Sequence, residues 1–179
     1  PGRTLGMSGM GRNGQDYAHR GRAFGMHIID HNRNRIEPAI EQELQAEYVA
    51  DHKELAKRSD VLSLHCPLTP ETHHLVDAAL LTMMPEHALL LNIARGAVID
   101  EAALAEALHN GTIAGAALDV FEEEPKVHPR LLSAPNTLVL PHIASATHET
   151  RKAIGMLAAN AILSVLEGQT EAATPNLIQ

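Results

Sequence analysis

The sequence has few of the residues on which several classes of protein depend. It has one cysteine, Cys66, in 179 residues, no tryptophan and only 2% aromatic residues. A single cysteine excludes an internal disulfide framework and fits a reducing compartment, so we expect a cytoplasmic protein. Because aromatic residues are so rare, we expect a core of Leu, Ile, Val, Ala and Met, which suits the packed layers of an α/β fold.

The chain also lacks an excess of positive charge and a long apolar run. Its 14 Lys and Arg residues against 22 Asp and Glu give a net charge of −8, which argues against non-specific nucleic-acid binding. No apolar run approaches the roughly 20 residues needed to cross a bilayer, so we expect no membrane partner. The twelve histidines show no spacing typical of a zinc site, and we predict no bound metal.

Short apolar runs alternate with helical patterns along the whole chain. Strands that are separated by helices need parallel crossovers, so we predict an α/β fold: a Rossmann-type doubly wound parallel sheet with helices on both faces. The expected strands are residues 4–8, 26–30, 61–65, 89–93, 114–118 and 138–140, with a weaker one near Tyr48 and Val49. The expected helices are residues 12–24, 40–46, 53–58, 77–82 and 101–110, and a last one whose apolar residues recur over 154–166.

A glycine-rich motif follows the first expected strand. Gly9, Gly11 and Gly14 have G-x-G-x-x-G spacing and precede a segment able to open a helix. The first glycine permits a tight turn, the second lets the backbone approach a pyrophosphate, and the third allows close packing of helix on strand. The helix N-terminus adds unpaired N–H groups and partial positive charge. We therefore predict a dinucleotide site here that includes Arg12 and Asn13.

Unusual polar residues stand just after the expected strands. In a parallel sheet these positions share the carboxyl edge, where open α/β folds bind their ligands. We therefore expect the glycine motif to share one edge with Asn32, Arg33, His65, Cys66, Pro67, Asn92, Arg95, Asp119 and His142.

Four motifs, in this order, resemble those of the D-isomer-specific 2-hydroxyacid dehydrogenases. They are G-R-T-L-G at 2–6 with the glycine motif, N-I-A-R-G at 92–96, L-D-V-F-E-E-E-P at 118–125 and P-H-I at 141–143. The resemblance covers nearly the whole chain but only the nucleotide-binding domain of that family. It implies that residues 1–168 form this domain. It also implies that the tail, 169–179, returns to a substrate domain that we expect to lie outside this sequence.

The resemblance implies a catalytic group of Arg95, Glu124 and His142. His142 would exchange a proton with the keto oxygen of the substrate, since an imidazole titrates near neutral pH. Glu124 would hold the other ring nitrogen, and Arg95 would grip the substrate carboxylate through its planar guanidinium. Taken singly, each of these residues would more often be structural: a surface ion pair, a solvated acidic loop or a satisfied histidine.

The residues after the second strand bear on the choice of cofactor. The resemblance places Asn32 where a NAD-preferring site has an acid, and Arg33 and Arg35 follow it. A neutral amide with two guanidinium groups suits a 2′-phosphate better than a carboxylate would, so we predict NADP, with NAD as the alternative. The other interpretation is that both arginines are simply exposed loop charges. The remaining expected cofactor contacts are Cys66, Pro67, Ile93, Ala94 and Asp119.

The sequence thus predicts an oxidoreductase that transfers hydride from a nicotinamide cofactor to a small 2-keto acid, giving a D-2-hydroxy acid. The residues of its motifs look most like those of the glyoxylate/hydroxypyruvate reductase branch. One alternative is another dehydrogenase of the family, such as a phosphoglycerate dehydrogenase. A second is a nucleotide-sensing module like the corepressors of the same fold family, which keep the Arg–Glu–His set. The resemblance also implies a homodimer.

Overall fold

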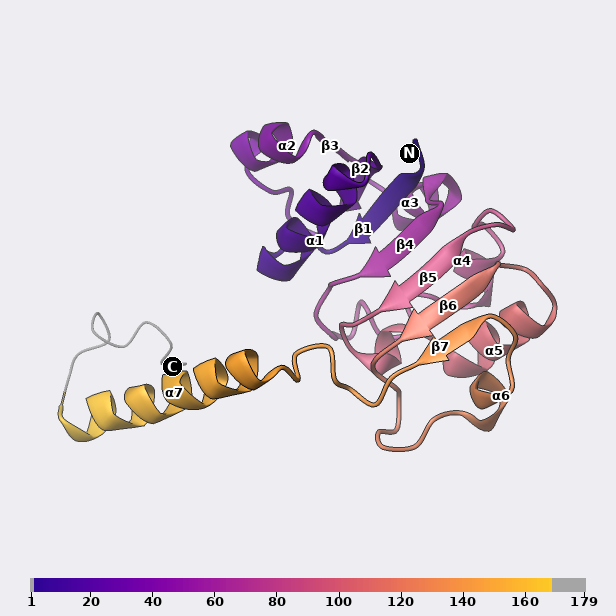
Figure 1. The fold of residues 1–179 in the computed structure, drawn as a ribbon. Helices are drawn as coiled ribbons and strands as arrows, with labels where there is room; N and C mark the ends of the chain where they lie inside the picture. The colour runs from indigo at the N-terminus through magenta and orange to yellow at the C-terminus, as the bar shows by residue number, and fades with distance from the viewer. Residues whose placement is uncertain (1, 169–179) are drawn as a thin grey trace. The chain divides into compact units, whose positions relative to one another are not determined.

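A computed structural model describes residues 2–168, and its centre is a seven-stranded parallel sheet (Figure 1). The strand order is β3-β2-β1-β4-β5-β6-β7. The strands are β1 (Thr4–Ser8), β2 (His27–His31), β3 (Ala46–Tyr48), β4 (Val61–Leu64), β5 (Leu89–Asn92), β6 (Gly115–Leu118) and β7 (Thr137–Val139). The chain winds outward in one direction from β1 and in the other from β4. The carboxyl ends of these two strands therefore flank the point at which an open sheet binds its ligand.

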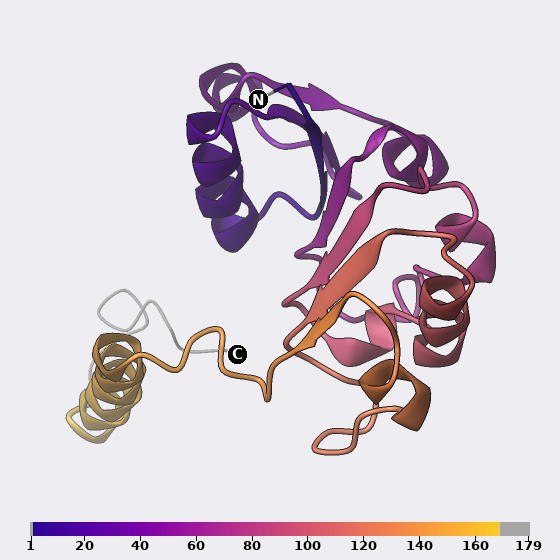
Figure 2. The same ribbon diagram turned by 45° about the vertical axis from the view of Figure 1, so that its right-hand side comes forward.

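Helices lie on both faces of this sheet (Figure 2). One face carries α1 (Arg12–Ala23) and α2 (Pro38–Leu44). The other carries α3 (His52–Arg58), α4 (Ala78–Leu81), α5 (Glu101–His109) and α6 (Pro129–Leu132). The arrangement confirms the predicted doubly wound α/β fold.

Two apolar clusters fill the space between the sheet and its helices, because successive strand residues point to opposite faces. Leu5, Met7 and Ile28 meet Ala18 of α1 and Leu44 of α2. The larger cluster lies under α3, α4 and α5 and includes Ile29, Leu62, Leu64, Leu90, Leu55, Leu81 and Leu104. Both clusters consist mainly of aliphatic residues and methionine, as the composition predicts.

The strands and most helices begin and end within two residues of their predicted limits, but the last helix begins at His148 rather than at 154. Helix α2 begins at Pro38 rather than at 40, because proline is favoured in a first helical turn. It ends at Leu44, since Gln45 takes a left-handed φ of 48°. Helix α6 and the 3₁₀ turn η1 (Gly96–Val98) were not predicted, since segments this short show no periodicity.

The chain forms two compact units, Pro1–His142 and Ile143–Gln179. In the second, α7 (His148–Leu166) is the predicted last helix. The Thr147 side chain caps it by accepting the N–H of Thr150, and Gly168 follows it with a φ of 70°. No helix within residues 2–168 is long and apolar enough to cross a membrane. The predicted tail, 169–179, lies outside the described residues.

Candidate active site

The glycine motif forms the turn between β1 and α1. Gly9 has a φ of 101°, and a Cβ there would stand 2.6 Å from the backbone nitrogen of Cys66. A Cβ on Gly14 would lie 2.4 Å from the Gly9 carbonyl oxygen, so both positions need glycine for the protein's own packing. A Cβ on Gly11, by contrast, would meet no protein atom within 4 Å. This open space before the first turn of α1 fits a pyrophosphate. The exposed residues of that first turn include Arg12 and Asn13.

Asn32 ties the end of β2 to the glycine loop. Its Oδ1 accepts the N–H of Met10 at 2.6 Å, and its Nδ2 donates to Asp30 Oδ2 at 2.9 Å. Asp30 is fully buried, and this burial raises the pKa of its carboxyl to about 6. An amide satisfies both contacts because it offers an acceptor and a donor. A carboxylate at position 32 would lose the donor and would face the carboxyl of Asp30.

The two arginines expected at the cofactor have different surroundings. Arg33 lines a cavity of about 520 Å³. Arg35 is not part of that lining, because its guanidinium makes two hydrogen bonds to the carboxylate of Glu41, at 2.7 and 2.6 Å. It also lies 5.2 Å from the centre of the Tyr48 ring. Of the two arginines, Arg33 lines the cavity, and Arg35 is ion-paired with Glu41.

The 520 Å³ cavity, called the nucleotide cavity below, lies between the glycine loop, the end of β2 and the loop after β4. The expected cofactor residues that line it are Gly9, Gly11, Asn32, Arg33, Cys66 and Pro67. Burial raises the pKa of the Cys66 thiol, so the side chain is a neutral thiol at neutral pH.

Three histidines that were not among the predicted cofactor residues also line the nucleotide cavity: His31, His52 and His65. The ring centres of His31 and His52 are 3.8 Å apart, and His52 Nε2 lies 3.1 Å from Ser8 Oγ. Burial lowers the pKa of both His52 and His65 to about 4, so these two are neutral at neutral pH. His65 was expected at this edge because it follows β4, and the place of His31 at the end of β2 was a usable signal. His52, at the start of α3, had none.

A second cavity of about 620 Å³, called the catalytic cavity below, is lined by Arg95, Glu124 and His142. His142 Nδ1 and Glu124 Oε2 are 2.7 Å apart, and Glu124 Oε1 accepts the N–H of Phe121 at 3.1 Å. The hydrogen bonds from His142 and from Phe121 hold the pKa of the Glu124 carboxyl below its usual value. At neutral pH this carboxylate is ionised, and it fixes the orientation of the imidazole.

The two cavities adjoin along the loop after β4, since Pro67 lines the nucleotide cavity and Leu68 lines the catalytic cavity. His142 follows β7 with a φ of 54°, a left-handed conformation that histidine tolerates better than most residues. The catalytic group and the cofactor loop therefore lie at the same carboxyl edge of the sheet.

Asn92, fully buried at the end of β5, builds the turn that carries Arg95. Its Oδ1 accepts the N–H of Ala94 at 3.0 Å, and its Nδ2 donates to the Arg95 carbonyl at 2.9 Å. The neighbouring Ile93 is exposed, and Asp119, at the end of β6, is buried. These expected cofactor residues thus lie at the carboxyl ends of adjacent strands, although they do not line the nucleotide cavity.

The sequence model of the family described as D-isomer specific 2-hydroxyacid dehydrogenase, NAD binding domain, matches residues 1–144. The chain belongs to this family. The match confirms the resemblance that the four motifs indicated, and it includes the glycine loop and all three residues of the expected catalytic group.

Named relatives cover nearly all of this chain. A glyoxylate reductase from Thermococcus litoralis is 47% identical over 99% of the chain and 52% of its own length. A D-3-phosphoglycerate dehydrogenase from Methanocaldococcus jannaschii is 44% identical over 94% of the chain and 32% of its own. A solved NADPH-dependent glyoxylate/hydroxypyruvate reductase from Sinorhizobium meliloti, in complex with NADP and malonate, is 40% identical with a TM-score of 0.88. That match covers 99% of this chain and 56% of that one. The chain spans about half the length of the curated glyoxylate reductases it matches.

Proposed function

We propose that the protein containing this chain reduces a small 2-keto acid, glyoxylate or hydroxypyruvate, to the D-2-hydroxy acid, and that residues 1–168 supply its nucleotide domain. The observation that carries the proposal is the hydrogen-bonded pair of His142 and Glu124, which shares one cavity with Arg95. This cavity adjoins a glycine loop with room for a pyrophosphate. The similarity to glyoxylate reductases over 99% of the chain supports the same reaction.

Reduction of a keto group needs a hydride at its carbon and a proton at its oxygen. A bound nicotinamide cofactor supplies the hydride. His142 donates the proton from Nε2, because its Nδ1 is engaged by Glu124. Glu124 holds the ring while this proton moves. Arg95 binds the substrate carboxylate through the two parallel N–H groups of its guanidinium, which orients the keto carbon.

We propose NADP as the preferred cofactor. Its 2′-phosphate would lie near Asn32, which adds no negative charge, and near Arg33, which faces the nucleotide cavity. The similarity to a reductase solved with NADP supports this choice. Arg35, with its charge held by Glu41, makes the smaller contribution. The proposed cofactor residues are Gly9, Gly11, Arg12, Asn13, Gly14, Asn32, Arg33, Arg35, Cys66, Pro67, Ile93, Ala94 and Asp119.

The cofactor proposal is tested by kcat/KM for NADPH and NADH with the intact enzyme. Arg33→Ala should lower kcat/KM for NADPH about 10- to 100-fold, the worth of a charge-assisted hydrogen bond, and leave NADH nearly unchanged. Arg35→Ala is the matched control, and its effect on the NADPH-to-NADH ratio should be much smaller. A wild-type preference for NADH would refute NADP as the cofactor.

The reaction is tested by following NADPH absorbance when glyoxylate or hydroxypyruvate is added to the full-length protein. His142→Ala should lower kcat by about 10²–10⁴-fold, as expected on loss of a general acid, while the dissociation constant for NADPH stays the same. His27→Ala is the control, since His27 is exposed at the start of β2, on the opposite edge of the sheet. Unchanged turnover in His142→Ala would remove His142 from the mechanism.

Two other functions are separated by the same assay. The 44% identical D-3-phosphoglycerate dehydrogenase makes oxidation of D-3-phosphoglycerate the second candidate, so this acid is included as a substrate. A protein that binds NADPH but turns over none of these acids would instead be a nucleotide-sensing module of the corepressor type.

We further propose a homodimer that works in the cytoplasm. The family resemblance supports the dimer, and the single cysteine fits a reducing compartment. Light scattering of the intact protein should give twice the mass of one chain, and the mass of a monomer would contradict the proposal.

A further inference from the structure

Glu124 lies on the segment between β6 and α6, which turns back on itself. Lys126 N donates to the Glu123 carbonyl at 2.9 Å, and these two residues form an isolated antiparallel bridge. The segment separates two cavities: Glu122, Glu123 and Lys126 line both the catalytic cavity and another of about 510 Å³ on the other side. The position of Glu124 therefore depends on what holds this segment.

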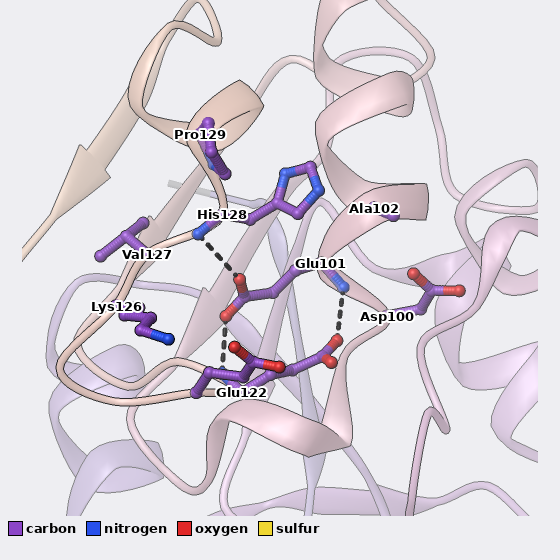
Figure 3. Close-up of a pocket in the computed structure, with 9 residues that line it drawn as sticks. Asp100, Glu101, Ala102, Glu122, Lys126, Val127, His128 and Pro129 are labelled. Atoms are coloured by element: carbon purple, nitrogen blue, oxygen red, sulfur yellow. Dashed lines mark hydrogen bonds between the residues drawn. The ribbon is translucent and has the colours of Figure 1, made fainter.

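Both ends of the segment are tied to one carboxylate, that of Glu101 (Figure 3). Its Oε1 accepts the N–H of Glu122 at 2.7 Å, and its Oε2 accepts the N–H of His128 at 3.2 Å. In return, Glu122 Oε1 accepts the N–H of Glu101 at 2.8 Å. Glu122 and His128 stand on either side of Glu124 in the sequence. A single side chain thus fixes both ends of the stretch that carries the expected catalytic carboxylate.

Glu101, which holds the segment, is itself held in place by the fold. Glu101 is the first residue of α5, and the Asp100 side chain caps that helix by accepting the N–H of Ala103 at 2.9 Å. Glu101 is only 7% exposed, so its buried carboxylate depends on backbone N–H groups for its hydrogen bonds. On the segment's other side, a Cβ on Gly96 would lie 1.9 Å from the Phe121 carbonyl carbon, so the two backbones are in direct contact.

We propose that Glu101, with Glu122 as its reciprocal partner, is a positioning residue for the catalytic pair. It holds residues 122–128 where Glu124 Oε2 reaches His142 Nδ1 at 2.7 Å. The inference rests on the proposed function, in which Glu124 orients His142. Glu101 is absent from the lining of the catalytic cavity and acts only through the backbone of the segment.

Loss of the Glu101 carboxylate leaves two backbone N–H groups without their acceptor, and the segment relaxes. A displacement of about 1 Å at a catalytic group lowers the rate by as much as about 100-fold. We therefore expect kcat of Glu101→Ala to fall about 10- to 100-fold per nucleotide-binding site. KM for NADPH should stay the same, because the nucleotide cavity has no lining residue in this segment.

The experiment compares variants of the full-length enzyme, with active sites counted by NADPH binding so that unfolded protein does not contribute. Glu122→Ala removes the reciprocal hydrogen bond, in which Glu122 accepts the N–H of Glu101. Because the Glu122 side chain is more exposed than that of Glu101, this variant replaces Glu101→Ala if that one folds poorly. Glu101→Gln keeps one acceptor oxygen and should recover part of kcat. Glu106→Ala is the matched control: it lies on the same helix and loses an ion pair to Arg130 and a hydrogen bond from Asn110, but it does not touch the segment.

The division of the effect between kcat and KM separates positioning from a general loss of stability. Glu124→Gln removes the carboxylate that holds His142 Nδ1, and it should lower kcat while KM for NADPH stays the same. Glu101→Ala should show the same pattern, because it loosens the same pair.

A wild-type enzyme that reduces no 2-keto acid overturns the proposed function and this inference together. An active wild type whose Glu101→Ala and Glu122→Ala variants keep the wild-type kcat overturns the inference alone. A lower kcat with a raised KM for NADPH and no recovery in Glu101→Gln also overturns it, since that pattern belongs to a merely structural residue.

Discussion

Alanine at Gly11 is expected to weaken cofactor binding without weakening the fold. The residue has φ −70° and ψ −172°, which alanine adopts without strain, and an added Cβ meets no protein atom within 4 Å. A Gly→Ala change at such a position gains about 0.4–1 kcal/mol through the unfolded chain. Loss of the N-cap preference for glycine offsets a similar amount. The free energy of unfolding should therefore change by less than about 1 kcal/mol.

Binding should respond differently, because the methyl group of Gly11→Ala would stand in the space proposed for the pyrophosphate. We expect the dissociation constant for NADPH to rise at least about tenfold, which corresponds to about 1.4 kcal/mol. The pyrophosphate binds the backbone N–H groups at the start of α1 through its negative charge and at short distance. It therefore cannot move away from the added methyl group and keep the same contacts.

Gly9→Ala is the contrasting variant. Its φ of 101° is costly for alanine, by about 1–3 kcal/mol. The new Cβ would also stand 2.6 Å from the Cys66 nitrogen, and overpacking of this kind costs about 1–3 kcal/mol. The two costs predict a loss of about 2–6 kcal/mol in the free energy of unfolding.

Urea unfolding without cofactor gives the stability of each variant, and calorimetric titration with NADPH gives its affinity. The reasoning is refuted if Gly11→Ala binds NADPH as tightly as wild type, because the space beside Gly11 would then not hold the pyrophosphate. It also fails if Gly11→Ala loses as much stability as Gly9→Ala.

Two further predictions concern stability. Burial raises the pKa of Asp30 from 3.8 to about 6, so the folded state holds this proton more tightly and stability falls as pH rises between these values. Asp30→Asn should flatten that slope in urea unfolding measured from about pH 4 to pH 8. A slope equal to that of the wild type would contradict the assignment. Gly96→Ala places a Cβ 1.9 Å from the Phe121 carbonyl carbon, where no flexible side chain can move aside. It should lower the free energy of unfolding by at least about 3 kcal/mol. A loss under about 1 kcal/mol would show that the backbone moves to make room.

The cofactor loop illustrates how far local rules reach. The G-x-G-x-x-G spacing after an apolar run indicated the strand, turn and helix, because backbone conformation and helix initiation depend on near neighbours. The motif also predicted that Gly11 faces the ligand and that Gly14 packs closely. It did not reveal that Gly9 touches the loop after β4, because that loop contributes Cys66 from more than fifty residues away.

The arginines after β2 show the opposite case. From the sequence, Arg33 and Arg35 were equivalent cationic residues, and both were assigned to a 2′-phosphate. The fold separates them, because α2 brings Glu41 within hydrogen-bonding distance of Arg35 alone. Which of two neighbouring charges faces a cavity depends on the register of the next helix, and α2 begins two residues before its predicted limit.

The sequence by itself determined the order of strands and helices, the apolar composition of the core and the common edge for the polar residues, since these follow from periodicity, turn residues and parallel winding. The family resemblance implied that Glu124 holds His142, but only the tertiary structure gave their 2.7 Å contact and placed Glu101 where it holds both ends of residues 122–128. Such contacts join residues that are far apart in the chain, and their distances depend on how whole elements pack. No local pattern encodes that packing.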